Sequence, residues 1–462
     1  MLKRIKTVNP LAAFVGLFLV FASYVGAQKA VLSDQQITSK ADEYMSAAVA
    51  VDGFSGSVLV ARNGQSVFSK GYGMANVELG VPNSPQSVFR LGSITKQFTG
   101  MAITMLQERG KLSVTDPICK YLTDCPPAWQ PLTVKHLLTH TSGIPNYTSF
   151  PEFGKTAVLP VSSAGMMSLL KDKPLEFSVG EKFAYSNSGY FLLGTIIERA
   201  SGKSYEAFLQ ENIFTPLGMK HSGYDSPTRI IKNRAAGYAR QSGEMVNAAY
   251  MDMTIPYAAG SLYSTTGDLL IWDQALYTEK LGVRKSLDEM FTPLKGDTGY
   301  GYGWSMGKRF ERQVIAHGGG IYGFATQITR FPADRVTIIV LCNVQGAPAG
   351  KVANDLGAIV FGGEYQIPKE RKEIALDAKI LEKYVGQYQI PPSIIISVML
   401  ENGKLLGQLG GQGKFALLAE SETVFFSKDV NAQITFNKDA QGQVTGLTLS
   451  QGGGNTPAQK IK

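Results

Sequence analysis

A serine and a lysine stand three residues apart in the segment Ser93-Ile94-Thr95-Lys96. If this segment opens a helix, residues i and i+3 share a face, so the Lys96 amine can take the proton of the Ser93 hydroxyl. This chemistry would make Ser93 a nucleophile. A Ser-x-x-Lys tetrapeptide also arises by chance in a long chain, so the pair is informative only together with other residues.

A tyrosine and an asparagine form a second group at Tyr185 and Asn187, just before an apolar segment of helical periodicity. Two residues apart, the phenol and the amide can face the same cavity. A nearby lysine cation would lower the pKa of Tyr185 and let it shuttle a proton, while Asn187 could donate to a substrate carbonyl. The alternative is that Asn187 only caps the following helix.

A histidine and three glycines form the third group, His317-Gly318-Gly319-Gly320, after a predicted strand. Glycines let a substrate backbone approach the strand, and a backbone N–H there can point at an oxyanion. A flexible glycine turn is the competing explanation.

No metal or organic cofactor is expected. His136 and His140 are four residues apart on a predicted helix, but the glutamate and the further ligand of a zinc-binding segment are missing. A nucleotide-binding loop ending at Gly202-Lys203-Ser204 lacks its first glycine, because Ile197 stands there.

The part of the chain that must position the three groups has predicted strands at both ends and predicted helices in the middle. A helix is expected over 34–50, and Asn63-Gly64 predicts a hairpin between strands 57–62 and 65–69. Helical patterns dominate 93–294, including helices over 190–200 and 204–213. Strands return at 313–316, 326–331 and 336–341. This order predicts one mixed sheet built from both ends of a domain.

The pattern changes after Gly362, where a charged segment, 364–376, has the composition of a linker. A short helix over 378–384 precedes alternating strands, which predict a small antiparallel barrel or sandwich; they are expected at 394–400, 405–409, 415–418, 424–426, 434–436 and 444–449. The tail from Gly452 is expected to be mobile.

The N-terminus has the form of a secretory leader, with a basic start, an apolar run over 11–21 and small residues at 25–27. We therefore expect a signal peptide over 1–27, an exported protein in the periplasm or outside the cell, and no stable membrane span after cleavage. The alternative is a retained anchor. In an oxidising compartment Cys119 and Cys125, six residues apart, could form a disulfide, whereas Cys342 is expected as a buried thiol.

The charge balance argues against a nucleic-acid partner. The formal net charge is +8, only 18% of the residues are charged, and no basic block is interleaved with aromatic residues. The sequence does not indicate an oligomeric state.

In this order, the three groups and their flanks resemble the serine β-lactamase and penicillin-binding-protein superfamily, nearest its class C-like branch. The flanks are Phe89-Arg90-Leu91-Gly92-Ser93, Leu137-Leu138-Thr139-His140-Thr141-Ser142-Gly143 and Tyr300-Gly301-Tyr302-Gly303-Trp304. The C-terminal part resembles the lipocalin-like β-domain often appended to such hydrolases. The resemblance implies an α+β, β-lactamase-like domain over 28–363, a linker over 364–376 and an all-β domain over 377–462.

The resemblance also implies a role for each residue of the three groups. Ser93 would be the acylated nucleophile, and Lys96 with Tyr185 would be its coupled base. Asn187 would hold the substrate amide, and His317, Gly318 and Gly319 would bind substrate along their strand. The backbone N–H groups of Ser93 and Gly320 would form the oxyanion hole.

Histidine at 317 departs from the Lys-Thr-Gly that many β-lactamases and transpeptidases carry there, and it resembles the esterase, D-aminopeptidase and carboxypeptidase-like branches. We expect an exported serine hydrolase that cleaves small esters, D-amino-acid amides or peptides, or peptidoglycan fragments. A β-lactam-hydrolysing enzyme of class C type is the alternative. A silent binding protein with the same cleft is a further alternative, against which intact Ser93, Lys96 and Tyr185 speak.

Overall fold

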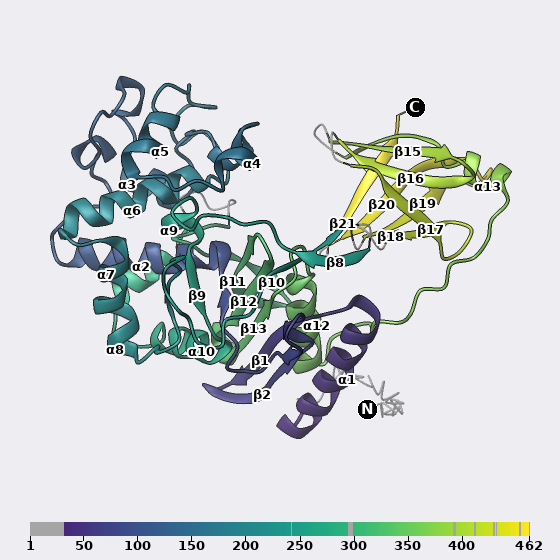
Figure 1. Cartoon of the computed structure of the whole chain (residues 1–462), viewed down its shortest axis with the longest axis horizontal. Helices are drawn as coiled ribbons and strands as arrows, with labels where there is room; N and C mark the ends of the chain where they lie inside the picture. Colours follow the sequence, from purple (N-terminus) through teal and green to yellow (C-terminus); the bar gives the residue numbers. More distant parts are fainter. Residues whose placement is uncertain are drawn as a thin grey trace, which may run out of the picture.

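The computed structural model of the chain describes residues 32–241, 243–293, 299–390, 394–410, 413–427, 430, 432–451 and 454–461. The predicted leader, 1–27, lies outside these residues. Figure 1 shows a central sheet with helices on both sides of it and a separate β-barrel formed by the last part of the chain.

The central sheet has six antiparallel strands in the order β10-β11-β12-β13-β1-β2. Their bounds are β1 Gly56–Arg62, β2 Gln65–Tyr72, β10 Ser305–Arg309, β11 Arg312–Ile321, β12 Phe324–Phe331 and β13 Val336–Cys342. Asn63 and Gly64 both have positive φ, 52° and 76°, as the tight hairpin between β1 and β2 requires. The prediction that both ends of the domain build one sheet is confirmed.

Helices cover both faces of this sheet. α1 (Asp34–Asp52) and α12 (Ala349–Phe361) pack on one face, while the helical region packs on the other. β13 lies between these layers, so all of its residues are buried, including the thiol of Cys342. Such a strand packs against other parts of the protein on both faces, and it holds the strands beside it in place.

The helical region spans the middle of the chain and contains short strands. Its helices are α2 Thr95–Glu108, α3 Val134–Leu138, α4 Phe153–Thr156, α5 Ser163–Leu170, α6 Asn187–Ser201, α7 Tyr205–Leu209, α8 Thr215–Leu217, α9 Tyr257–Gly260, α10 Thr266–Ala275 and α11 Arg284–Met290. Its strands are β3 Met74–Asn76, β4 Val81–Pro82, β5 Phe89–Arg90, β6 Gly223–Tyr224, β7 Tyr238–Gln241, β8 Glu244–Asn247 and β9 Leu262–Ser264. α2 is buried from Thr95 to Leu106, so the helix that follows Ser93 is the centre of this region.

Two local predictions in this region have different outcomes. Cys119 and Cys125 form the predicted disulfide, with their Cα atoms 5.4 Å apart. The prediction that His136 and His140 share a helix is wrong, because α3 ends at Leu138 and His140 has a left-handed φ of 56°.

Residues 363–377 contain no helix or strand and lead into the barrel. The barrel follows α13 (Ala378–Glu382) and is closed by antiparallel strands β14 Gly386–Ile390, β15 Ile394–Glu401, β16 Lys404–Leu409, β17 Phe415–Ala419, β18 Val424–Ser427, β19 Ala432–Lys438, β20 Val444–Gln451 and β21 Gly454–Lys460. The predicted all-β barrel is confirmed. Its interior combines aliphatic side chains with aromatic rings, among them Tyr384 stacked on Phe436 at 4.4 Å between ring centroids.

The expectation of a mobile tail from Gly452 is wrong for the residues that the structure describes there. β21 pairs with β20 along its length and with β14 through Tyr388 opposite Lys460. Because closure removes the free edges of the sheet, the last strand is held on both sides despite its polar sequence.

Candidate active site

Ser93 and Lys96 lie at the start of the buried helix α2, facing each other. Ser93 is in a 3-10 turn, Gly92–Ile94, that runs directly into α2, and Lys96 is in the first turn of the helix. The Lys96 Nζ and the Ser93 Oγ are 3.0 Å apart. The predicted proximity of amine and hydroxyl is therefore present in the structure.

The Lys96 amine is fully buried and has three oxygen partners. In addition to Ser93, it contacts the Asn187 Oδ1 at 2.8 Å and the Ala259 carbonyl oxygen at 2.9 Å. Burial holds the pKa of Lys96 well below its usual value, because the charged form is poorly solvated there. The contact with Ala259, in α9, could not be predicted from the sequence, because any residue type can supply a backbone carbonyl.

Tyr185 precedes α6, and the Lys96 amine lies 4.8 Å from the centroid of its ring. About 36% of the residue is exposed. A lowered pKa was the condition under which Tyr185 could shuttle a proton, and the structure does not meet it. Burial of the hydroxyl raises the pKa of Tyr185, and the hydrogen bond with Ser93 opposes this only in part. At neutral pH Tyr185 is therefore a phenol.

Asn187 is the first residue of α6, and its side chain is turned toward Lys96. Its Oδ1 accepts from Lys96, and its Nδ2 donates to the Thr148 hydroxyl at 3.2 Å. The N-cap of α6 is Ser186, and no side chain caps the helix. The alternative that Asn187 only caps the helix is therefore excluded.

The glycine strand β11 lies directly against the turn that carries Ser93. A Cβ on Gly319 would overlap the Leu91 carbonyl oxygen, and the Thr326 hydroxyl donates to that same oxygen at 2.7 Å. A Cβ on Gly92, which has a left-handed φ of 55°, would lie 2.9 Å from the Gly320 nitrogen. Glycine at 319 permits this close packing, which brings the Gly320 nitrogen beside the residue that precedes Ser93.

His317, also in β11, is buried and neutral. Its Nδ1 lies 2.6 Å from the Gly318 carbonyl oxygen, and its Nε2 lies 2.8 Å from the Tyr300 hydroxyl. Because a carbonyl oxygen can only accept, Nδ1 carries the ring proton. Burial, with the Lys96 amine nearby, lowers the pKa of His317 to about 4. The sequence had indicated Tyr300 only as part of a flanking segment, without a role at the site.

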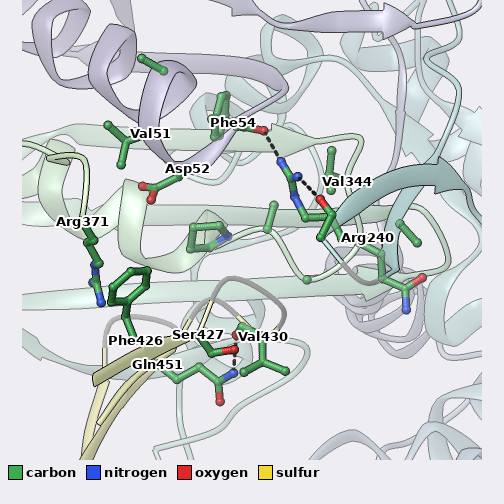
Figure 2. A pocket seen from close by; sticks show the side chains of 18 of the residues that line it. Val51, Asp52, Phe54, Arg240, Val344, Arg371, Phe426, Ser427, Val430 and Gln451 are labelled. Atoms are coloured by element: carbon green, nitrogen blue, oxygen red, sulfur yellow. Dashed lines mark hydrogen bonds between the residues drawn. The ribbon is translucent and has the colours of Figure 1, made fainter. Parts of the chain in front are cut away.

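Two clefts lie where the barrel approaches the sheet. The larger has a volume of about 1070 Å³ (Figure 2), and its lining includes Asp52, Arg240, Arg371, Phe426 and Gln451. Ser93, Lys96, Tyr185 and Asn187 do not line it. A smaller one, of about 310 Å³, reaches Gly318 and Gly319 from Gln451 of the barrel. The residues around Ser93 are thus connected by hydrogen bonds and lie outside the larger cleft.

In the described part of the chain, no group of three or more histidine, cysteine, aspartate or glutamate side chains is placed to hold a metal ion. Within the same residues, no helix combines the length and the apolar character that crossing a membrane requires.

Comparison with known proteins agrees with this geometry. The family model described as Beta-lactamase matches residues 41–360, which include the sheet, the helical region and the site residues Ser93, Lys96, Tyr185, Asn187 and His317. The chain belongs to the beta-lactamase family of serine hydrolases. A second model, described as a domain of unknown function, DUF3471, matches residues 370–459, where the barrel lies.

Relatives of this beta-lactamase family member include penicillin-binding proteins. A penicillin-binding protein of Bacillus subtilis (strain 168) is 32% identical over 410 residues, which cover 83% of this chain and 90% of that protein. The solved structure of an octameric penicillin-binding protein homologue from Pyrococcus abyssi is 27% identical, with a TM-score of 0.65, and covers 91% of this chain and 99% of that one. A D-stereospecific amidohydrolase from Streptomyces sp. is 25% identical, with a TM-score of 0.57, over 67% of this chain and 94% of that one.

Proposed function

We propose that this protein hydrolyses esters or amides through an acyl-enzyme on Ser93, with Lys96 as the base. The observation that carries the proposal is the buried Lys96 amine with its three oxygen partners. A neutral amine has two N–H donors, which match the Asn187 and Ala259 oxygens. Its lone pair is then left to accept the Ser93 proton.

The proposed reaction has an acylation and a deacylation step. Lys96 Nζ takes the proton from Ser93 Oγ as the oxygen attacks the substrate carbonyl, and the N–H groups of Ser93 and Gly320 bind the oxyanion that forms. The Tyr185 phenol donates its proton to the leaving group, and the Lys96 ammonium restores it. Water then attacks the acyl-enzyme and releases the acid, with the same groups moving its proton.

The neutral state of His317 bears on the proposed substrate. A lysine at this position would supply a permanent cation for a substrate carboxylate, whereas the lowered pKa of His317 leaves the strand uncharged at pH 7. This favours small esters and D-amino-acid amides or peptides, including peptidoglycan fragments, over β-lactams. The D-stereospecific amidohydrolase among the structural neighbours is consistent with this class. β-Lactam hydrolysis stays the alternative, since the relatives include penicillin-binding proteins.

We further propose that the protein is exported to the periplasm or the cell exterior. The Cys119–Cys125 disulfide supports this, because such bonds persist mainly in oxidising compartments. The proposed parts are a leader over 1–27, a hydrolase domain over 28–363, a linker over 364–376 and a β-domain over 377–462.

An acylating probe tests the nucleophile. A fluorophosphonate or a fluorescent penicillin should add its mass to Ser93 of the wild type and not to the Ser93→Ala variant. The absence of an adduct with both probes, or an equal adduct on the variant, would refute the proposal.

A substrate panel tests the proposed class. We expect kcat/KM to be higher for p-nitrophenyl esters and D-alanyl amides than for nitrocefin. Preferred turnover of nitrocefin would instead establish the β-lactamase alternative.

A further inference from the structure

His140 holds both backbone N–H groups that flank Tyr185. Its carbonyl oxygen accepts from the Ala184 nitrogen at 2.9 Å, and its ring Nδ1 accepts from the Ser186 nitrogen at 3.1 Å. One residue therefore fixes the backbone before and after the tyrosine. The left-handed φ of His140, 56°, gives it the conformation in which it makes both contacts.

The His140 ring also packs directly on the Tyr185 ring. Their centroids are 4.3 Å apart at an interplanar angle of 36°. Phe183, Tyr190 and Tyr300 surround the same imidazole, with centroids 5.7, 5.1 and 4.7 Å from it. The His140 ring thus supports one side of the Tyr185 ring, and the Tyr185 hydroxyl contacts Ser93.

The hydrogen bond from Ser186 determines the protonation of the ring. Because Nδ1 accepts from a backbone N–H, it carries no proton, and the proton of the neutral ring is on Nε2. That atom is buried and has no hydrogen-bond partner within the described part of the chain. Burial and the nearby Lys96 keep the pKa of His140 well below its usual value, so the ring stays neutral.

An unpartnered buried N–H lowers stability, and phenylalanine would fill an aromatic cage without that loss. The unpartnered Nε2–H of His140 is the cost of placing its Nδ1 where it accepts from Ser186. What distinguishes histidine from phenylalanine here is the Nδ1 acceptor, which holds the Ser186 backbone.

We propose that His140 is a positioning residue that holds the Tyr185 phenol against Ser93 through the Nδ1 acceptor of its ring. The inference rests on the proposed function, because it assigns His140 to the same acylation step. It needs only that Tyr185 transfers a proton in that step, and His140 itself contacts no reacting atom.

Two substitutions that both remove the ring differ in whether an acceptor remains at the position of Nδ1. In His140→Asn, the amide oxygen takes the place of Nδ1, and asparagine adopts a left-handed φ readily. In His140→Gln, the amide lies near the place of Nε2, so Ser186 loses its acceptor. We expect fluorophosphonate acylation of Ser93 to fall by less than about threefold in the first variant and by roughly 10²-fold in the second, since small misplacements near reacting atoms have effects of this size.

A double-mutant cycle with Tyr185→Phe distinguishes positioning from general destabilisation. If His140 acts through the Tyr185 hydroxyl, His140→Gln should lower the acylation rate by less than about threefold when Tyr185 is already phenylalanine. A general loss of structure would lower the rate equally in both backgrounds. Thermal unfolding of each variant verifies that the comparison is made on folded protein.

Each outcome decides the inference. Non-additive effects with retention in His140→Asn support it. Additive effects, an unchanged rate in His140→Gln, or an equal loss in the asparagine and glutamine variants would overturn it. If His140→Gln does not fold, His140→Phe, which keeps a ring and lacks the acceptor, takes its place in the same comparison. Failure of the proposed function is recognised separately, because the wild type would then form no adduct on Ser93.

Discussion

The Lys96 amine lies 3.0 Å from the Ser93 hydroxyl in a place where Lys96 has no solvent exposure. Lys96→Met keeps the length of the side chain and removes the base. We expect acylation of Ser93 to slow by about 10²–10⁴-fold, the usual contribution of a positioned base. The rate of fluorophosphonate labelling, followed by mass spectrometry, measures it.

The same variant should be at least as stable as the wild type at pH 7. The pKa of Lys96 is lowered in the folded state, so below the usual value of 10.5 the unfolded chain binds a proton that the folded chain does not. This cost of folding shrinks as the pH rises toward 10.5. Denaturant unfolding at pH 7 and pH 10 tests the direction of this change in the free energy of unfolding. If the variant is labelled at the wild-type rate, Lys96 has no part in the mechanism.

His317 should make the stability depend on pH in a defined window. Its pKa is about 4 in the folded protein and 6.5 in the unfolded chain, so the unfolded chain binds more protons between these values. Stability should therefore rise with pH from 4 to 6.5, by about 3 kcal/mol from this residue. His317→Gln should lose that part of the rise, which urea unfolding at several pH values measures. Parallel pH profiles for the two proteins would contradict the assignment of a neutral His317.

Gly319→Ala should separate β11 from the turn that carries Ser93. The new Cβ would overlap the Leu91 carbonyl oxygen, and backbone atoms on both sides must move. We expect a loss of about 1–3 kcal/mol in the free energy of unfolding, as for other overpacked sites. The acylation rate should fall by roughly 10²-fold, because the Gly320 N–H, the proposed oxyanion donor, moves with the strand.

Gly320→Ala is the matched control for stability. A Cβ at this position meets no atom within 4 Å, so the free energy of unfolding should change by less than about 0.5 kcal/mol. Equal destabilisation by the two alanines would show that general glycine effects, rather than the contact with Leu91, determine the result.

Removal of residues 454–462 should open the barrel. Without β21, the strands β14 and β20 each lose a partner and the aromatic interior is exposed at the gap. Limited proteolysis should then cut within the barrel while Ser93 still reacts with a fluorophosphonate. Deletion of Lys462 alone keeps β21 and serves as the control. Unchanged protease resistance of the shortened chain would contradict the closed arrangement.

Features encoded by neighbouring residues were predictable from the sequence. The Asn63-Gly64 hairpin and the stop of α6 at Gly202, with a φ of 73°, follow from conformations that few residues adopt. Ser93 and Lys96 were recognised for the same reason, since three residues along a helical turn fix their proximity.

Features that depend on distant contacts were not predictable. β21 has a polar sequence with a proline, Pro457, and becomes a strand because β14 and β20 hold it on both sides. The Ala259 carbonyl reaches Lys96 only through the packing of α9 against α2. A lowered pKa of Tyr185 was considered because a neighbouring lysine was foreseen, whereas the burial that raises the pKa was not.

The position of β13 between β12 and β1 affects how the hydrolase part is made. Gly56 pairs with Cys342, so a growing chain carries the β1–β2 hairpin for most of the synthesis of this part before its central partner exists. Contacts between residues so far apart in sequence form slowly. Ser93 can meet the glycine strand β11 only after that strand has also emerged. The site around Ser93 is therefore complete only when nearly all of the hydrolase part has been synthesised.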